Sequence, residues 1–158
     1  EDLKASKNDS VFRQNIEREG RFDVLSETSE KPLELINIAF YAPLKGLISD
    51  SYDLQNKHFG VDVLAAENEA IKASLGGTVI FSDWTTETGY SIAIQHDNNL
   101  ISFYKHNSVL LKKPGELVKA GDVIAIIGNS GEFSSGPHLH FEMWHKGKPI
   151  NPEHHILF

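Results

Sequence analysis

The sequence predicts a mainly β protein, folded as a compact antiparallel β-sandwich or barrel. From residue 78 onward, short runs of β-branched and aromatic residues alternate with polar ones, as in strands that are buried on one face. Gly, Pro, Asn and Asp residues separate these runs, and almost no helical periodicity is present. The chain has 158 residues, of which 40% are hydrophobic, so it is long enough to bury one core. We therefore expect one domain with a short appendage.

The expected appendage is a leader over residues 1–31, which are polar and carry charges of both signs. Val11, Phe12 and Ile16 stand at near-helical spacing, so the leader is expected to be a short amphipathic helix or an extended stalk. It would either hold the domain away from a membrane or fold back over the functional site. The domain itself is expected over residues 32–158.

The first expected strand covers residues 78–81, a β-branched and aromatic run that follows two glycines. The next two, 90–96 and 100–106, alternate apolar and polar residues. Residues 97–99, Asp-Asn-Asn, connect them, and Asn and Asp tolerate the left-handed backbone conformations of tight turns. This pair is therefore expected to form a hairpin.

Two further turns are expected at 113–115 and 118–122, because both contain glycine beside polar or proline residues. The apolar run 123–127 follows and is expected to be a buried strand. The last expected strand, 138–144, alternates histidine or glutamate with apolar residues. All of these strands are short enough to belong to one compact antiparallel fold.

The composition excludes several classes of function. A net charge of −7 and a pI near 5.6 give no general attraction for nucleic acid or for an anionic membrane surface. The absence of cysteine excludes disulfides and thiolate ligands, so any metal must be bound by imidazole and carboxylate. Eight histidines are available for this purpose. No apolar run approaches a membrane span. Because the chain starts at Glu1 without a signal-peptide pattern, we expect a longer precursor whose missing N-terminal segment serves as a membrane tether.

The segment Gly136-Pro137-His138-Leu139-His140-Phe141-Glu142 is the most informative part of the sequence. In a strand the side chains alternate between faces, so the two histidines and Glu142 share one face while Leu139 and Phe141 take the other. One imidazole is then able to bind a metal while the other contacts a water molecule beside it. Taken alone, the pattern also fits an exposed strand with two incidental histidines.

Two further segments carry candidate functional residues. His58 and Asp62 stand four residues apart with Gly60 between them, and a carboxylate with two imidazoles is a catalytic zinc set that leaves a fourth position for water. His106 ends a strand and by alternation shares a side with Tyr104, opposite Phe103, which indicates a site rim rather than the core.

In this order, the His-x-x-x-Asp, Tyr-x-His and Gly-Pro-His-Leu-His-Phe-Glu patterns resemble the lysostaphin-type (LytM-like) zinc metalloendopeptidases, which cleave peptide bonds of bacterial peptidoglycan. The resemblance extends from about residue 43 to 152. It implies one Zn²⁺ per chain, bound by His58, Asp62 and His140, with His106 and His138 as the catalytic pair. It also implies a barrel-sandwich hybrid fold (duplicated hybrid motif), peptidoglycan peptides as substrates and an extracytoplasmic location.

The chain departs from the family pattern at two places. Asn107 follows His106 where the family usually has Leu, and a Gly-x-Arg element that often precedes the first ligand is replaced by residues 51–56. Both places lie beside the expected groove rather than on the ligands, so they bear on substrate preference more than on metal binding.

Other conspicuous residues are interpreted as structural. His96 is expected to be a solvated turn residue, and His145, His154 and His155 are expected at the surface or in packing. Trp84 and Tyr90 are expected to pack beneath the loop that they bound. The glycine-rich stretches 128–131 and 134–136 lack the Lys-Ser/Thr of a phosphate-binding loop.

Two alternative functions remain open from the sequence. A non-catalytic relative would keep the fold and activate other cell-wall hydrolases, although all five site positions are filled here. A carrier domain of the lipoyl or biotinyl type would share the strand pattern at 118–126, but it would leave the histidines unexplained.

Overall fold

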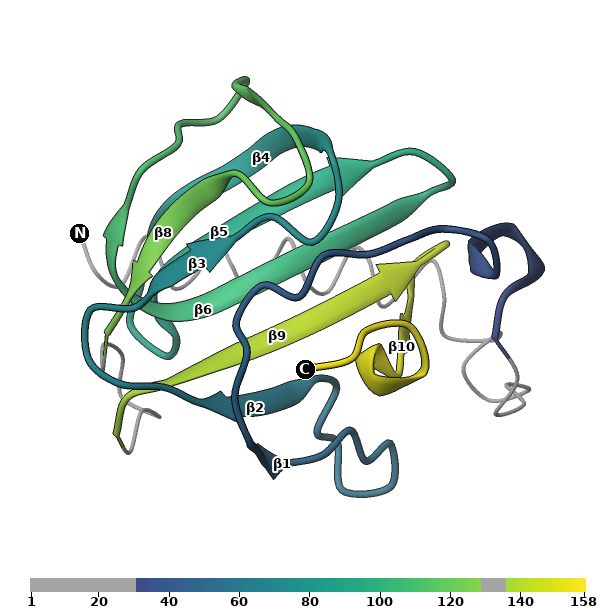
Figure 1. Cartoon of the computed structure of the whole chain (residues 1–158), viewed down its shortest axis with the longest axis horizontal. Coiled ribbons are helices and arrows are strands. Elements are labelled where there is room, and N and C mark those ends of the chain that lie inside the picture. Colours follow the sequence, from purple (N-terminus) through teal and green to yellow (C-terminus); the bar gives the residue numbers. More distant parts are fainter. Residues whose placement is uncertain (1–30, 129–135) are drawn as a thin grey trace.

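The computed structural model describes residues 31–128 and 136–158 (Figure 1). Almost all of its regular structure is β, with two single-turn 3₁₀ helices near the ends of the described chain. In order, the elements are η1 (Leu33–Leu35), β1 (Ile48–Asp50), β2 (Val61–Leu64), β3 (Ala70–Lys72), β4 (Gly77–Thr85), β5 (Gly89–His96), β6 (Leu100–Leu110), β7 (Leu117–Val118), β8 (Val123–Ile127), β9 (His138–His145), β10 (Lys148–Ile150) and η2 (Pro152–His154).

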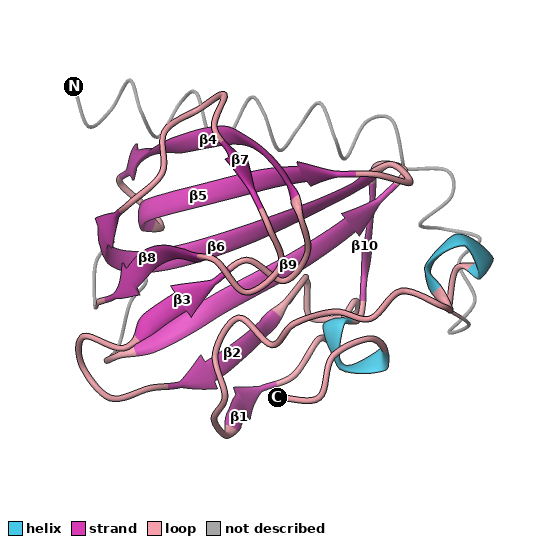
Figure 2. Ribbon diagram, turned by 45° about the horizontal axis from the view of Figure 1, so that its top comes forward, coloured by secondary structure: helices cyan, strands magenta, loops and turns pink. Residues whose placement is uncertain are grey.

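The described strands form one hydrogen-bonded sheet of ten strands that is antiparallel at every pairing. The main path runs β1-β2-β9-β6-β5-β4-β7, while β10 pairs with β9, and β8 pairs with both β3 and β6. The sheet does not close on itself. β8 pairs with the last part of β6, and β3 and β8 form a layer in front of the long strands β5 and β6 in Figure 1, while Figure 2 shows the same strands from a second direction. The prediction of a mainly β, antiparallel fold is confirmed.

The hairpin expected between residues 90–96 and 100–106 is present, as β5 and β6. Asn98 and Asn99 both adopt positive φ angles, of 63° and 56°, between β5 and β6. Two consecutive left-handed residues match the right-handed twist of the flanking strands, as in a type I′ turn. Gly121, with a φ of 87°, lies in the turn expected at 118–122, which connects β7 and β8 although these two strands pair with other strands. The strands predicted at 78–81, 90–96, 100–106, 123–127 and 138–144 correspond to β4, β5, β6, β8 and β9.

The main hydrophobic core lies between the long sheet and the layer that covers it. Leu139, Phe141 and Met143 of β9 are fully buried in it, as the alternating pattern predicted. The opposite face of the same sheet carries a smaller apolar cluster around Phe103 and Trp144. β9 lies in the interior of the sheet, between β2 and β6, so its two faces contribute to two different environments.

The predicted leader and its amphipathic helix at Val11, Phe12 and Ile16 lie outside the described residues, apart from Lys31. The same holds for most of the glycine-rich stretches 128–131 and 134–136. In the described part of the chain, no helix has the length and apolar character needed to cross a membrane.

Candidate metal centre and active site

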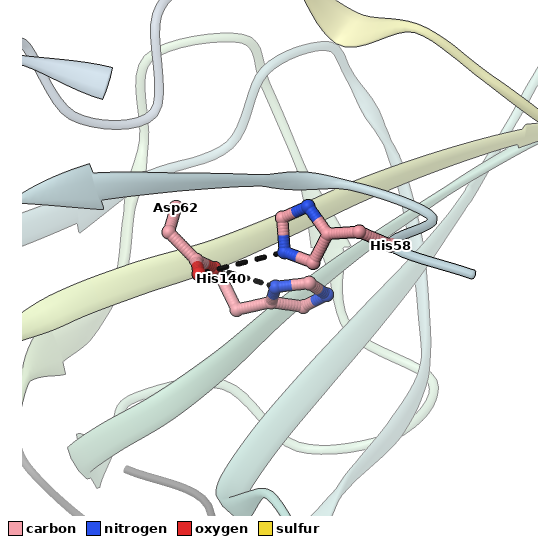
Figure 3. A group of neighbouring side chains, drawn as sticks. All are labelled: His58, Asp62 and His140. Carbon is pink, nitrogen blue, oxygen red and sulfur yellow. Dashed lines mark hydrogen bonds and ion pairs between the residues drawn. The ribbon is translucent and has the colours of Figure 1, made fainter. Parts of the chain in front are cut away.

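The pairing of β2 with β9 places Asp62 directly opposite His140. Residues opposite each other in an antiparallel pair project to the same face, so carboxylate and imidazole meet. His58 lies four residues before Asp62, in the turn that leads into β2, and forms an isolated bridge with Asp53. Figure 3 shows the three side chains converging from these two segments. The structure therefore brings His58, Asp62 and His140 together.

The donor atoms of this group lie close enough to share one ion. His140 Nδ1 is 2.7 Å from Asp62 Oδ1, and His58 Nε2 is 3.4 Å from Asp62 Oδ2 (Figure 3). One ligand atom from each residue can be chosen so that all lie within 4.8 Å of one another. Two imidazole nitrogens and a carboxylate oxygen are the donors of a catalytic zinc site, and tetrahedral ligands at about 2.0–2.2 Å from zinc stand roughly 3.4 Å apart. The residues thus fit a zinc ion.

Gly60 allows this convergence. A Cβ atom built there would lie 2.3 Å from the carbonyl oxygen of Phe141 and 2.7 Å from Cγ of Glu142. Any side chain would separate the turn before β2 from β9, and His58 and Asp62 on either side of it would move with the turn. The glycine between the two candidate ligands is therefore a packing requirement of the site.

The carboxylate and imidazole of this group stabilise each other's charged forms. Burial favours the neutral form of Asp62, but the hydrogen bond from His140 together with the electrostatic attraction of the nearby imidazoles outweighs it, so the pKa of Asp62 is lowered. Burial alone would lower the pKa of His140, yet hydrogen bonds to Asp62 and Glu142 outweigh it and raise the pKa. Both shifts favour the charged forms, and a metal ion bound at His140 Nδ1 would take the place of a proton there.

Both candidate histidine ligands have an acceptor at their other ring nitrogen. His58 Nδ1 lies 2.7 Å from the carbonyl oxygen of Ser51. A carbonyl only accepts, so Nδ1 carries the proton and Nε2 faces Asp62 with its lone pair. His140 Nε2 lies 2.7 Å from Glu142 Oε2. Such acceptors fix the orientation and tautomer of metal-binding histidines. The sequence predicted that they would exist without identifying them.

His106 and His138 lie beside this group. Their ring centroids are 5.0 Å apart, and the ring of His106 is 6.4 Å from that of His140. The Nδ1 atom of His138 is 2.8 Å from the carbonyl oxygen of Gly136, so Nδ1 carries the proton and Nε2 is the acceptor. All five residues predicted for the site are therefore gathered at one end of β9.

The sequence argument for the direction of His106 is wrong. Tyr104, on whose side His106 was placed, is fully buried in the main core, whereas Phe103 belongs to the smaller cluster on the site face. Strict alternation would thus direct His106 into the core. Instead, His106 has a φ of 70°, and β6 gains one residue against β5 between Tyr104 and Asn107. This bulge redirects the imidazole to the site face.

The prediction for His96 is also wrong. His96 is 4% exposed, its Nδ1 donates to the carbonyl of Gly76, and its Nε2 lies 2.7 Å from Ser102 Oγ. Burial lowers its pKa. The alternation of Ile92, Ile94 and His96 on one face of β5 was the signal for burial, and the adjoining turn obscured it.

The expectation that His145, His154 and His155 lie at the surface or in packing is confirmed. His145 is buried and its Nε2 lies 3.2 Å from Glu34 Oε2. His154 is exposed, and His155 contacts Phe40 edge-on. Trp84 and Tyr90 contact each other edge-on, with ring centroids 5.1 Å apart, but Tyr90 is 42% exposed, so the expectation that it packs beneath the loop is wrong.

Two residues near the site were not singled out from the sequence. Glu142 is 2% exposed and Lys105 is 1% exposed, with Lys105 Nζ 3.6 Å from Glu142 Oε2. Buried acids and bases are rare unless they are paired. The sequence did carry a signal for Glu142, because strand alternation places it on the same face as His138 and His140.

Comparison with known proteins gives a family-level match. Residues 56–152 match the profile described as Peptidase family M23. The chain is 35% identical over 95 residues to the DD-carboxypeptidase/endopeptidase Mpg of Neisseria meningitidis, covering 60% of this chain and 22% of that protein. It is 33% identical over 113 residues to the murein hydrolase activator NlpD of Escherichia coli, covering 70% of this chain and 29% of that protein. The chain thus spans under a third of the length of these relatives.

Solved structures share the fold. A zinc containing peptidase from Vibrio cholerae is 28% identical, with a TM-score of 0.68 over 72% of this chain and 39% of that one. The catalytic domain of lysostaphin from Staphylococcus simulans is 27% identical, with a TM-score of 0.59 over 68% of this chain and 87% of that one. The resemblance deduced from the histidine motifs is confirmed, and the chain belongs to peptidase family M23, with a LytM-type domain.

Proposed function

We propose that this chain is a zinc-dependent endopeptidase that hydrolyses peptide bonds of bacterial peptidoglycan, either cross-links or stem peptides. The observation that carries the proposal is the convergence of His58, Asp62 and His140, with the imidazoles of His106 and His138 beside them. A metal-binding group alone would suit storage or a structural site. Two further imidazoles at its edge suit hydrolysis, because they supply proton transfer.

His58 Nε2, one carboxylate oxygen of Asp62 and His140 Nδ1 would hold the zinc ion. When bound, zinc polarises the scissile carbonyl and lowers the pKa of a water molecule toward about 7. Since Asp62 is the only carboxylate among the three ligands, the site keeps a net positive charge with Zn²⁺, which favours an incoming carbonyl oxygen.

His138 is the proposed general base. Its Nδ1–H donates to the carbonyl of Gly136, so its Nε2 lone pair is available to take a proton from the attacking water and pass it to the leaving amine. His106, whose ring lies 5.0 Å away, would donate a hydrogen bond to the oxyanion that forms on the scissile carbonyl. His138 and His106 thus have different proposed roles, as general base and as oxyanion donor, which the sequence did not assign to one or the other.

The names of the relatives support the substrate and the location. One is a DD-carboxypeptidase/endopeptidase and the other a murein hydrolase activator, and both names refer to the chemistry or regulation of the cell wall. Peptidoglycan lies outside the cytoplasm, so we propose an extracytoplasmic location for this chain. The net charge of −7 does not favour nucleic acid as a partner.

A second candidate function is activation of other cell-wall hydrolases without catalysis. The similarity to NlpD, at 33% identity over 70% of this chain, favours it. This reading requires no turnover at the histidines, even if the metal-binding group retains an ion.

The deciding experiment combines metal analysis with digestion of purified peptidoglycan, with muropeptide products followed by mass spectrometry. We expect about one zinc per chain, cleavage that stops with a chelator and returns with Zn²⁺, and no cleavage by His138→Ala. The matched control is His154→Ala, which removes an exposed histidine far along the chain from the site. Zinc binding without cleavage of any peptidoglycan type would support the activator function instead.

A further inference from the structure

A buried carboxylate lies directly behind the candidate ligand His140. Glu142 is 2% exposed, and both of its oxygens have defined neighbours. Its Oε2 is 2.7 Å from His140 Nε2, and its Oε1 accepts a hydrogen bond of 2.9 Å from Trp144 Nε1. Lys105 Nζ lies 3.6 Å from Oε2. The carboxylate is therefore held from three directions, one of which is the imidazole.

Strand geometry explains why these residues meet. His140, Glu142 and Trp144 occupy alternate positions of β9, so they share one face. Lys105 of β6 lies directly opposite His140, and Phe103 lies opposite Glu142. Lys105 therefore approaches Glu142 diagonally across the two strands, where long side chains can meet.

The arrangement determines which nitrogen of His140 faces the metal group. Carboxylates face both ring nitrogens, so a metal ion bound at Nδ1 would leave the single proton of a neutral His140 on Nε2, where the carboxylate of Glu142 accepts it. The lone pair is then on Nδ1, the atom that lies 2.7 Å from Asp62 Oδ1. The ammonium group of Lys105 and the indole N–H of Trp144 offset the cost of burying the carboxylate charge.

We propose that Glu142, whose other oxygen is held by Trp144, is a positioning residue that fixes the tautomer and orientation of His140 for metal binding. The inference rests on the metal site of the proposed function. A purely structural Lys105–Glu142 pair would contribute to the stability of the fold but would leave metal affinity unchanged. The two roles therefore differ in a measurable property other than turnover.

The test measures Zn²⁺ affinity by competition with a chromophoric chelator for the wild type, Glu142→Gln, Lys105→Met and the double variant. Gln keeps the size of the side chain but removes its charge. We expect Glu142→Gln to lower Zn²⁺ affinity by about 10–100-fold, the usual effect of losing such a partner. Lys105→Met keeps the bond between His140 and Glu142, so it should lower thermal stability but change Zn²⁺ affinity by no more than a few-fold.

The double variant covers the case in which Glu142→Gln alone does not fold, because it leaves no buried cation without a counter-charge. Relative to Lys105→Met, the double variant should again lose about 10–100-fold in Zn²⁺ affinity. In the zinc-loaded protein, the ¹H NMR signal of the His140 Nε2 proton should move upfield when the charged acceptor is lost. Equal affinities of the double variant and Lys105→Met would overturn the inference. The wild-type affinity tests the metal site itself, so failure of the proposed function is recognised separately.

Discussion

His106 and His138 approach each other, with ring centroids 5.0 Å apart, only because His106 departs from regular strand geometry. His106 has a φ of 70° within a bulge of β6, while His138 is the first residue of β9. A non-glycine residue in the left-handed region costs about 1–2 kcal/mol relative to ordinary strand geometry. The rest of β6, paired on both sides, supplies the contacts that maintain this conformation.

The left-handed conformation of His106 gives a stability prediction. His106→Gly should be more stable than His106→Ala by about 1 kcal/mol, because glycine adopts positive φ without steric cost. Denaturant unfolding of the two variants measures the difference. In β8, the partly exposed Val123 provides the control, where Gly should be less stable than Ala by about 0.5–1 kcal/mol. If Ala were the more stable at both positions, the left-handed assignment for His106 would be wrong.

Gly60 gives a prediction that links packing to metal binding. Gly60→Ala should lower the free energy of unfolding by about 1–3 kcal/mol, because the added Cβ would lie 2.3 Å from the Phe141 carbonyl oxygen. It should also weaken Zn²⁺ binding, since His58 and Asp62 flank it. Gly115→Ala is the control: its Cβ would meet no atom within 4 Å, and its φ of 93° costs only about 1–2 kcal/mol. Equal Zn²⁺ affinities in the two variants would contradict this coupling.

Zinc should stabilise the folded chain through Asp62. A ligand that binds only the native state at 100 times its dissociation constant adds about 2.7 kcal/mol to the free energy of unfolding. We expect Zn²⁺ to raise the melting temperature of the wild type, chelation to reverse the increase, and Asp62→Asn to show little response. Asp53→Asn serves as the control, because Asp53 contacts the same turn but lies outside the metal-binding group. A full zinc response in Asp62→Asn would show that the ion binds elsewhere.

The pH dependence of stability should reflect His155, a half-buried histidine near the C-terminal end of the described residues. Burial lowers the pKa of His155 from its ordinary value of 6.5 to about 4. Between pH 6.5 and about 4, His155 is protonated in the unfolded chain but stays neutral in the folded chain. The free energy of unfolding therefore falls as the pH decreases over this interval. Above pH 6.5 His155 is neutral in both the folded and the unfolded chain, so the stability lost at lower pH is fully present.

The comparison with His155→Gln isolates this effect, because the variant should lose less stability over the same pH interval. His96, whose pKa burial also lowers, contributes in the same direction and is unchanged in both proteins. An NMR titration provides the direct measurement. A midpoint for His155 near 6.5 rather than near 4 would contradict the prediction.

Regular strand patterns were readable from the sequence. β9 was predicted with the correct faces because its apolar and polar residues alternate without interruption, and the Asn98–Asn99 turn was predicted because few residues tolerate two left-handed conformations in succession. The family motifs then named five residues that the fold brings together. The role of each of them in metal binding or catalysis stays a prediction.

Other features depended on contacts that a sequence does not show. β2 is only four residues long and is recognisable as a strand through its pairing with β9. The bulge at His106 is a relation between β6 and β5, so a period-two pattern within β6 could not reveal it. The acceptor for His58 is a backbone carbonyl, at Ser51, which carries no side-chain signal at all.

β9 separates side chains of the main core from those of the candidate site. Leu139, Phe141 and Met143 enter the main core, while His138, His140 and Glu142 face the other side of the same sheet. For protein engineering, this means that the metal-ligand residues and the pKa values of side chains on the site face can be changed without repacking the main core. The same strand would then accept ligand sets for other metals, provided that Gly60 and the bulge at His106 are kept.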